Sequence, residues 1–220
     1  MRLALSILCL IGSISSCTSK MQNTHASHFN DGRAKPIVAI VPYFDRSNTS
    51  VGWNISDEFN HLIQDALIKK NSFYLTSPTD ISLATVDLTA SQNPFSNDFG
   101  WVKDTFENNE YVVFTEIVEH DIHPRELKGT YLDVVKMSYE LTATVRVRVF
   151  DLRGREAEVV LQELLHKNYP LPKSSSFFTS QPDRWKRFFH AVSPIGIAHA
   201  KINKEIVDRV ENYIMISKSN

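Results

Sequence analysis

The chain has 220 residues, of which 42% are hydrophobic and 22% charged, an ordinary composition for a folded protein with a substantial core. Its formal net charge of −1 excludes the strongly basic surface that nucleic-acid binding requires. Both cysteines, Cys9 and Cys17, lie near the start, so the rest of the chain offers no disulfide, zinc–thiolate cluster or thiolate nucleophile.

The chain opens with a predicted targeting segment. Arg2 precedes a mostly apolar stretch, residues 3–14, which is too short to cross a bilayer as a helix, since that takes about 20 residues. The stretch ends in an aliphatic residue, two small residues and a cysteine: Ile14, Ser15, Ser16 and Cys17. This pattern resembles the bacterial lipobox. The resemblance implies cleavage before Cys17, a diacylglyceryl thioether on its sulfur and a fatty acyl chain, such as palmitate, on its new amino group.

Two or more acyl chains hold a protein stably on a membrane, whereas a single chain does so only marginally. Thr18 follows the cysteine, and by the sorting pattern of enteric bacteria this resembles an outer-membrane lipoprotein facing the periplasm. A plain secretory signal with a chance cysteine and an uncleaved anchor are the alternatives. We therefore expect a signal peptide over 1–16, a lipidated flexible tether over 17–35 and one domain over 36–216.

The first part of that domain predicts a strand, a helix and a second strand. Residues 36–44 form a short aliphatic run opened by proline, typical of a buried strand, and residues 72–78 predict another. Asn54 or Ser56 is expected to cap the helix between them, with acidic residues near its positive end. Its apolar residues recur at helical spacing: Ile55, Phe59, Leu62, Ile63, Ala66 and Leu67.

Weaker patterns follow. A helix is expected around 81–88, then an aromatic loop over 91–101 with a short helix after it, and a β-branched strand over 110–120. Residues 137–150 alternate, which predicts a strand with one packed face and one solvated polar face. That polar face would carry Thr142, Thr144, Arg146 and Arg148.

The end of the chain is partly ambiguous. Residues 157–166 have helical spacing, yet they follow the tight turn at 151–156 as a hairpin strand would. Helices are expected over 183–192 and from Pro194 to about Tyr213.

Residues 36–78 and the later strands together resemble the domain of a group of bacterial envelope proteins. The group includes the curli-secretion-channel family, the lipoprotein activators of penicillin-binding proteins and the amino-terminal domain of the Tol translocation protein. The resemblance rests on "IVAIVPYF" with its following helix, on "YVVFTEIVE" and on "ELTATVRVRVFDLRGREAEVV". It implies an α/β (α+β) fold, with a mixed sheet and helices packed mainly on one face, and it favours a strand at 157–166. It transfers no functional residue.

The tightest polar cluster spans residues 116–126 and offers metal-ligand types: Glu116, Glu119, His120, Asp121, His123 and Glu126. His120 and His123 would lie on opposite faces of a strand, so a joint metal site needs the turn before Pro124 to bend them together. The alternative interpretation is a solvated strand end, and we expect no metal and no cofactor.

Aromatic residues offer two interaction surfaces. One lies in the predicted loop at Phe95, Phe99 and Trp101, where the alternative is a plug over the core. The other is the basic and aromatic stretch 184–189, including Trp185 and Arg187, which could lie on a membrane or dock on the domain as an amphipathic helix.

No nucleophile elbow, phosphate-binding loop, dinucleotide fingerprint or metalloprotease helix motif is present in the sequence. We therefore expect a lipid-anchored, non-catalytic envelope protein that binds another envelope protein or itself, and no nucleic acid. A metal-dependent envelope enzyme using residues 116–126 and a subunit of a secretion or transport complex are the alternatives.

Overall fold

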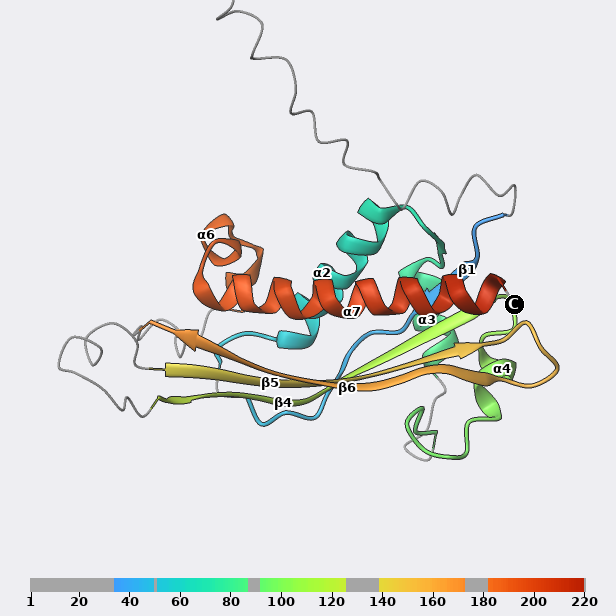
Figure 1. Ribbon diagram of the computed structural model, residues 1–220, viewed down its shortest axis with the longest axis horizontal. Helices are drawn as coiled ribbons and strands as arrows, with labels where there is room; N and C mark the ends of the chain where they lie inside the picture. Colours follow the sequence, from blue (N-terminus) through green and yellow to red (C-terminus); the bar gives the residue numbers. More distant parts are fainter. Residues whose placement is uncertain (1–33, 50, 87–91, 126–138, 173–181, 220) are drawn as a thin grey trace, which may run out of the picture. The chain divides into compact units, whose positions relative to one another are not determined.

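A six-stranded mixed sheet organises the computed structural model, which describes residues 34–49, 51–86, 92–125, 139–172 and 182–219 (Figure 1). The strand order is β3-β1-β4-β5-β6, and β2 pairs with β4. The pairings of β1, β2 and β3 are parallel, and those among β4, β5 and β6 are antiparallel. The strands are β1 (Ile37–Ile40), β2 (Phe44–Asp45), β3 (Tyr74–Leu75), β4 (Tyr111–Pro124), β5 (Tyr139–Asp151) and β6 (Glu158–Leu171).

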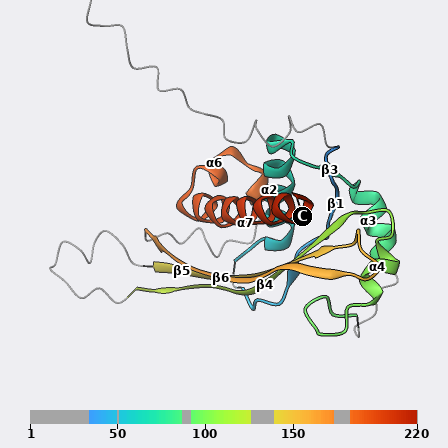
Figure 2. The same cartoon turned by 45° about the vertical axis from the view of Figure 1, so that its right-hand side comes forward.

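The two long helices, α2 and α7, lie on the same side of this sheet (Figures 1 and 2), and their apolar residues share one core with it. Shorter helices α3 and α4 pack against part of the opposite face. The sequence therefore predicts the mixed sheet and its main helical layer correctly, and Ala34–Asn220 forms one compact unit. The helices are α2 (Ile55–Lys70), α3 (Pro78–Thr85), α4 (Trp101–Thr105), the 3-10 turn η3 (Arg184–Lys186), α6 (Phe188–Ala191) and α7 (Pro194–Ser219).

Helix α2 begins and ends at residues suited to those positions. The Asn54 side chain accepts a hydrogen bond from the Asp57 backbone N–H at 3.3 Å, so the predicted cap at Asn54 is confirmed. Asn71 ends the helix in the left-handed region at φ 54°, which asparagine tolerates better than most residues. This fixed helix places its buried residues Ile55, Glu58 and Phe59 against the sheet and α7.

Strand β6 resolves the ambiguity at 157–166 in favour of a strand, because residues 158–171 pair antiparallel with β5. The packed face predicted for β5 is confirmed, and its alternate apolar residues share a core with α7, but the expectation of a solvated opposite face is wrong. Thr142, Thr144 and Arg148 are buried, and the Arg148 guanidinium donates to the backbone oxygens of Pro94 and Ser96 at 2.8 and 2.7 Å. The segment after residue 92 thus covers part of this face.

Strand β4 contains a bulge. Ile117 pairs with Val145, but the next pair in the register joins Glu119 to Thr144, so Val118 has no partner on β5. An extra residue in one strand reverses the alternation of the side chains that follow it. His120 therefore points to the same face as Ile117, toward α7, instead of the opposite face.

The predicted single helix at 183–192 is interrupted at Arg187, whose extended backbone (φ −86°, ψ 142°) separates η3 from α6. Ser193 then caps α7, because its Oγ accepts from the Gly196 N–H at 3.2 Å, and Pro194 occupies the first helical position. Among the described helices, none is both long enough and apolar enough to cross a bilayer.

Candidate functional site

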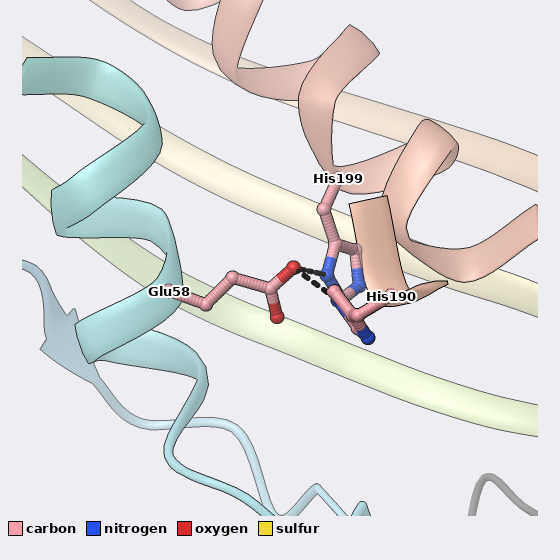
Figure 3. Close-up of side chains that lie close together, drawn as sticks. All are labelled: Glu58, His190 and His199. Atoms are coloured by element: carbon pink, nitrogen blue, oxygen red, sulfur yellow. Dashed lines mark hydrogen bonds and ion pairs between the residues drawn. The ribbon is translucent and has the colours of Figure 1, made fainter. Parts of the chain in front are cut away.

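A buried carboxylate, Glu58, is the centre of the most unusual polar cluster in the core. Glu58 is 2% exposed and lies between Ile55 and Phe59 on the apolar face of α2. Its Oε1 accepts from His190 Nε2 at 2.7 Å and from His199 Nδ1 at 2.8 Å (Figure 3). Its Oε2 accepts from the Trp53 indole at 2.7 Å. Three donors thus satisfy a charge that would be costly to bury alone.

The cluster joins a helix from the first part of the domain to two consecutive helices near its end. Glu58 comes from α2, His190 from α6 and His199 from α7 (Figure 3). His199 is fully buried because it shares the apolar face of α7 with Ile195 and Ile202. The His190 backbone lies very close to α7 at Gly196, where an added Cβ would collide with the His190 carbonyl oxygen. The absence of a side chain at Gly196 permits this approach.

A second line of contacts extends the cluster to the sheet. His120 Nε2 lies 2.9 Å from His199 Nε2, and His120 Nδ1 lies 2.9 Å from Thr49 Oγ1. The bulge at Val118 is what brings His120 to this side of β4. The chain Thr49–His120–His199–Glu58 therefore runs from the segment after β2, through β4 and α7, to α2.

The hydrogen-bond partners assign the imidazole protons. A carboxylate oxygen only accepts, so His199 Nδ1 and His190 Nε2 each carry a proton. If His199 is neutral, its Nε2 accepts from His120 Nε2, and His120 Nδ1 accepts from the Thr49 hydroxyl. If His199 is doubly protonated, both of these bonds reverse. Each arrangement gives every nitrogen along this chain a partner.

Burial and charge set the ionisation of the cluster. Burial raises the pKa of Glu58, but its electrostatic interaction with His199 and the hydrogen bonds from His190 and His199 outweigh burial, so the net pKa lies below the usual range. Burial, reinforced by His199, lowers the pKa of His120 to about 3 despite the opposing effect of Glu58. At neutral pH, Glu58 is therefore ionised and His120 is neutral.

The arrangement has the donor types of a metal centre. Glu58 Oε1, His190 Nε2 and His199 Nδ1 all lie within 4.8 Å of one another, and within the described ranges this is the one group of three or more such residues. A cavity of about 260 Å³ reaches Glu58 and His190 and is also lined by His61, Asp65 and Trp185. The cluster is thus buried among side chains yet borders a space that admits water.

The structure does not gather the predicted 116–126 cluster into one site. Glu116 lies on the face away from α7 and pairs with Arg46 at 2.8 Å and with Arg146. His123 lies on that same face, 3.7 Å from Glu140. Because β4 continues straight through Pro124, His120 and His123 remain on opposite faces.

Glu119, also on the face away from α7, accepts from the Thr144 hydroxyl at 2.8 Å. Glu126 lies outside the described residues, as do Ile14, Ser15, Ser16 and Cys17. Of the cluster residues that the structure describes, only His120 contacts the buried site.

The two predicted aromatic surfaces differ in exposure. Phe95, Phe99 and Trp101 are half-buried against the apolar residues on the sheet face away from α7, so they cover that part of the core. Arg146 lies 4.4 Å from the Phe95 ring centroid. In the second surface, Trp185 packs against the main core and lies 5.4 Å from His61 by ring centroid. Arg187 is exposed.

Sequence reasoning missed Glu58, His190 and His199 as a group. Glu58 precedes His190 by 132 residues and His199 by 141 residues, and no local motif joins it to them. A signal was present in each long helix, because a charged or polar residue interrupts an apolar face: Glu58 beside Phe59 and His199 between Ile195 and Ile202.

Comparison with known proteins places the chain in a family. Residues 24–218 match a family of unknown function, DUF7499. The chain belongs to this family. The DUF7499 match includes Glu58, His190 and His199, and it begins after Cys17. No protein with a curated description matches the sequence.

Solved structures similar to this DUF7499 chain include lipoproteins. The hypothetical protein CT253 from Chlamydia trachomatis is 26% identical, with a TM-score of 0.61 over 82% of this chain and 98% of that one. Lipoprotein GNA1162 from Neisseria meningitidis is 12% identical, with a TM-score of 0.44 over 80% and 99%. The LpoB C-terminal domain from Salmonella enterica is 13% identical, with a TM-score of 0.38 over 65% and 91%.

Proposed function

We propose that this protein is a lipid-anchored, non-catalytic component of the bacterial cell envelope that binds another envelope protein. The lipobox-like residues Ile14–Cys17 support the anchor, and Thr18 favours the outer membrane with the domain facing the periplasm. A tether over residues 17–35 would span at most about 60 to 70 Å when fully extended, enough to let the domain meet a partner some distance from the lipid.

The observation that supports binding is the exposed aromatic segment, defined as residues 184–192. Phe188 and Phe189 are 74% and 80% exposed, and Val192 is 54% exposed. Clustered large apolar side chains at this exposure are typical of interaction sites, because water gains freedom when a partner covers them. Phenylalanine and arginine, both present here, are enriched at protein interfaces.

Buried neighbouring side chains fix the backbone that carries these rings. His190, next to Phe189, is buried on Glu58, and Trp185 packs on the main core. The Arg184 guanidinium lies 5.5 Å from the Trp53 ring centroid. A partner would therefore meet rings on a fixed backbone, which lowers the entropy lost on binding.

Site-specific photocrosslinking in intact envelopes tests this proposal. A photoreactive phenylalanine analogue at position 189 of the full, lipidated chain should crosslink to one envelope protein. The same analogue at Leu164, which is exposed on β6, is the matched control and should not. Crosslinks only to lipid would instead support a membrane-surface role for the segment, and crosslinks only to a second copy would support self-association; either result would contradict the proposal.

A further inference from the structure

We infer that Glu58, His190 and His199 form a binding site for one divalent transition-metal ion of the zinc class, with an open coordination position toward the neighbouring cavity. This inference does not depend on the proposed docking function. His190 lies within residues 184–192, but its side chain is buried, and the exposed Phe188 and Phe189 rings supply no ligand.

The donor set fits this class of ion. Two imidazole nitrogens and one carboxylate oxygen are ligands that Zn²⁺ binds at about 2.0 to 2.2 Å, in sites that leave a fourth position for water. Ligands of a tetrahedral ion at those lengths lie about 3.3 Å apart. Glu58 Oε1 lies 2.7 and 2.8 Å from the two nitrogens, so the carboxylate must withdraw by about half an ångström. The flexible glutamate side chain allows that movement.

The surrounding contacts orient two of the three candidate ligands, Glu58 and His199, whereas His190 Nδ1 is buried with no hydrogen-bond partner among the described residues. A ligating carboxylate and a ligating histidine usually have their remaining atoms fixed by further hydrogen bonds. Trp53 holds Glu58 Oε2, which leaves Oε1 for an ion. His120, itself in contact with Thr49, holds the far nitrogen of His199.

Proton balance is maintained when an ion binds. His199 Nδ1 must give up its proton to coordinate, and His199 then carries a proton on Nε2, which donates to His120 Nε2. His120 carries its own proton on Nδ1 and donates to the Thr49 hydroxyl. His190 likewise carries its proton on Nδ1 while Nε2 binds the ion. Each imidazole keeps one proton, and a doubly protonated imidazole would release its extra proton to water.

Access is provided by the cavity of about 260 Å³ that reaches Glu58 and His190. A water molecule needs only about 10 to 15 Å³ of such space, so an ion and its remaining water ligand fit. His61 and Asp65 line the same cavity and are partly exposed, and Lys186 and Arg187 line it too, so an arriving cation meets side chains of both charges.

The experiment is a titration of the full, untagged chain in detergent after removal of metal by a chelator. Calorimetry with Zn²⁺ should show one bound ion per chain, and Co²⁺ should give the strong visible bands of a four- or five-coordinate site. His190→Gln, which preserves volume, should weaken Zn²⁺ binding at least tenfold. His166→Gln, at an exposed position on β6, is the matched control and should bind normally.

His25 and His28 fall in the predicted tether and are the other candidate ligands, so the double variant His25→Gln/His28→Gln should also bind normally. If His190→Gln does not fold, the Co²⁺ spectrum of the unsubstituted chain decides alone. Weak bands of a six-coordinate ion, no binding of either metal, or unchanged binding in folded His190→Gln would overturn the inference and leave a metal-free hydrogen-bond cluster.

Discussion

His120 and His199, which are 79 residues apart in the chain, meet through their Nε2 atoms at 2.9 Å in the core. At this distance one nitrogen donates and the other accepts, so the two imidazoles cannot both be doubly protonated while the contact persists. The contact couples the protonation state of His120 on β4 to that of His199 on α7. It also couples both histidines to Glu58, since His199 donates to its carboxylate.

Acid should destabilise the fold through His120. Its pKa is about 3 in the folded protein against 6.5 in the unfolded chain, so below pH 6.5 the unfolded chain binds a proton that the folded protein does not. The free energy of unfolding should therefore decrease as the pH falls, by up to about 1.4 kcal/mol per pH unit for this group between pH 6.5 and 4.5. Below that range Glu58, whose folded pKa is also lowered, adds to the loss.

Urea denaturation at several pH values measures this slope. His120→Gln should remove about one proton's worth of pH dependence between pH 6.5 and 4.5, whereas His166→Gln should keep the slope of the unsubstituted protein. An unchanged slope in His120→Gln would show that another group is responsible.

Removing the charge of Glu58 should be costly. Glu58→Gln replaces an oxygen that accepts two imidazole protons, or the one that accepts from Trp53, with an amide NH₂ that cannot accept. We expect a loss of about 2 to 4 kcal/mol in the free energy of unfolding, since buried donors lose their partner. Glu156→Gln, in the exposed turn after β5, should change it by less than about 0.5 kcal/mol. Equal effects of the two substitutions would be inconsistent with a buried cluster.

Gly196 should not tolerate a methyl group. In Gly196→Ala the new Cβ would collide with the backbone carbonyl of His190 and push α6 away from α7, so His190 would move off Glu58. Gly100→Ala is the control, because a Cβ there meets nothing within 4 Å. A lowered Tm is expected for the first variant and an unchanged or raised Tm for the second, and thermal unfolding followed by circular dichroism compares them.

The exposed rings should matter for binding and not for stability. Phe188→Ser/Phe189→Ser should change the free energy of unfolding by less than about 0.5 kcal/mol per residue, because both rings face solvent. The same double variant should lose copurification with its envelope partner. If the folded double variant still copurified with the partner, the docking surface would have to lie elsewhere on the protein.

Local patterns in the sequence predict most of the fold. Periodicity identifies α2 and α7, alternation identifies β5, and turn position together with the family resemblance identifies β6. The covered polar face of β5 is not predicted, because residues 92–100 cover it. Their hydrogen bonds with Arg148 join parts of the chain that are distant in the sequence.

The candidate site is predicted only at His120. Its face depends on one unpaired residue, Val118, and a bulge leaves no clear mark in a β-branched run. Glu58 fits two positions equally well from sequence, as a charge near a helix N-terminus and as a buried group. Only the packing of α6 and α7 against α2 decides between them.

Mass spectrometry of the mature protein from native membranes tests the proposed anchoring most directly. The account predicts a chain that begins at Cys17, with a diacylglyceryl group on sulfur and an acyl chain on the amino group, and an unprocessed, unlipidated precursor in Cys17→Ala. A mature chain that begins elsewhere, or an unmodified Cys17 thiol, would contradict it.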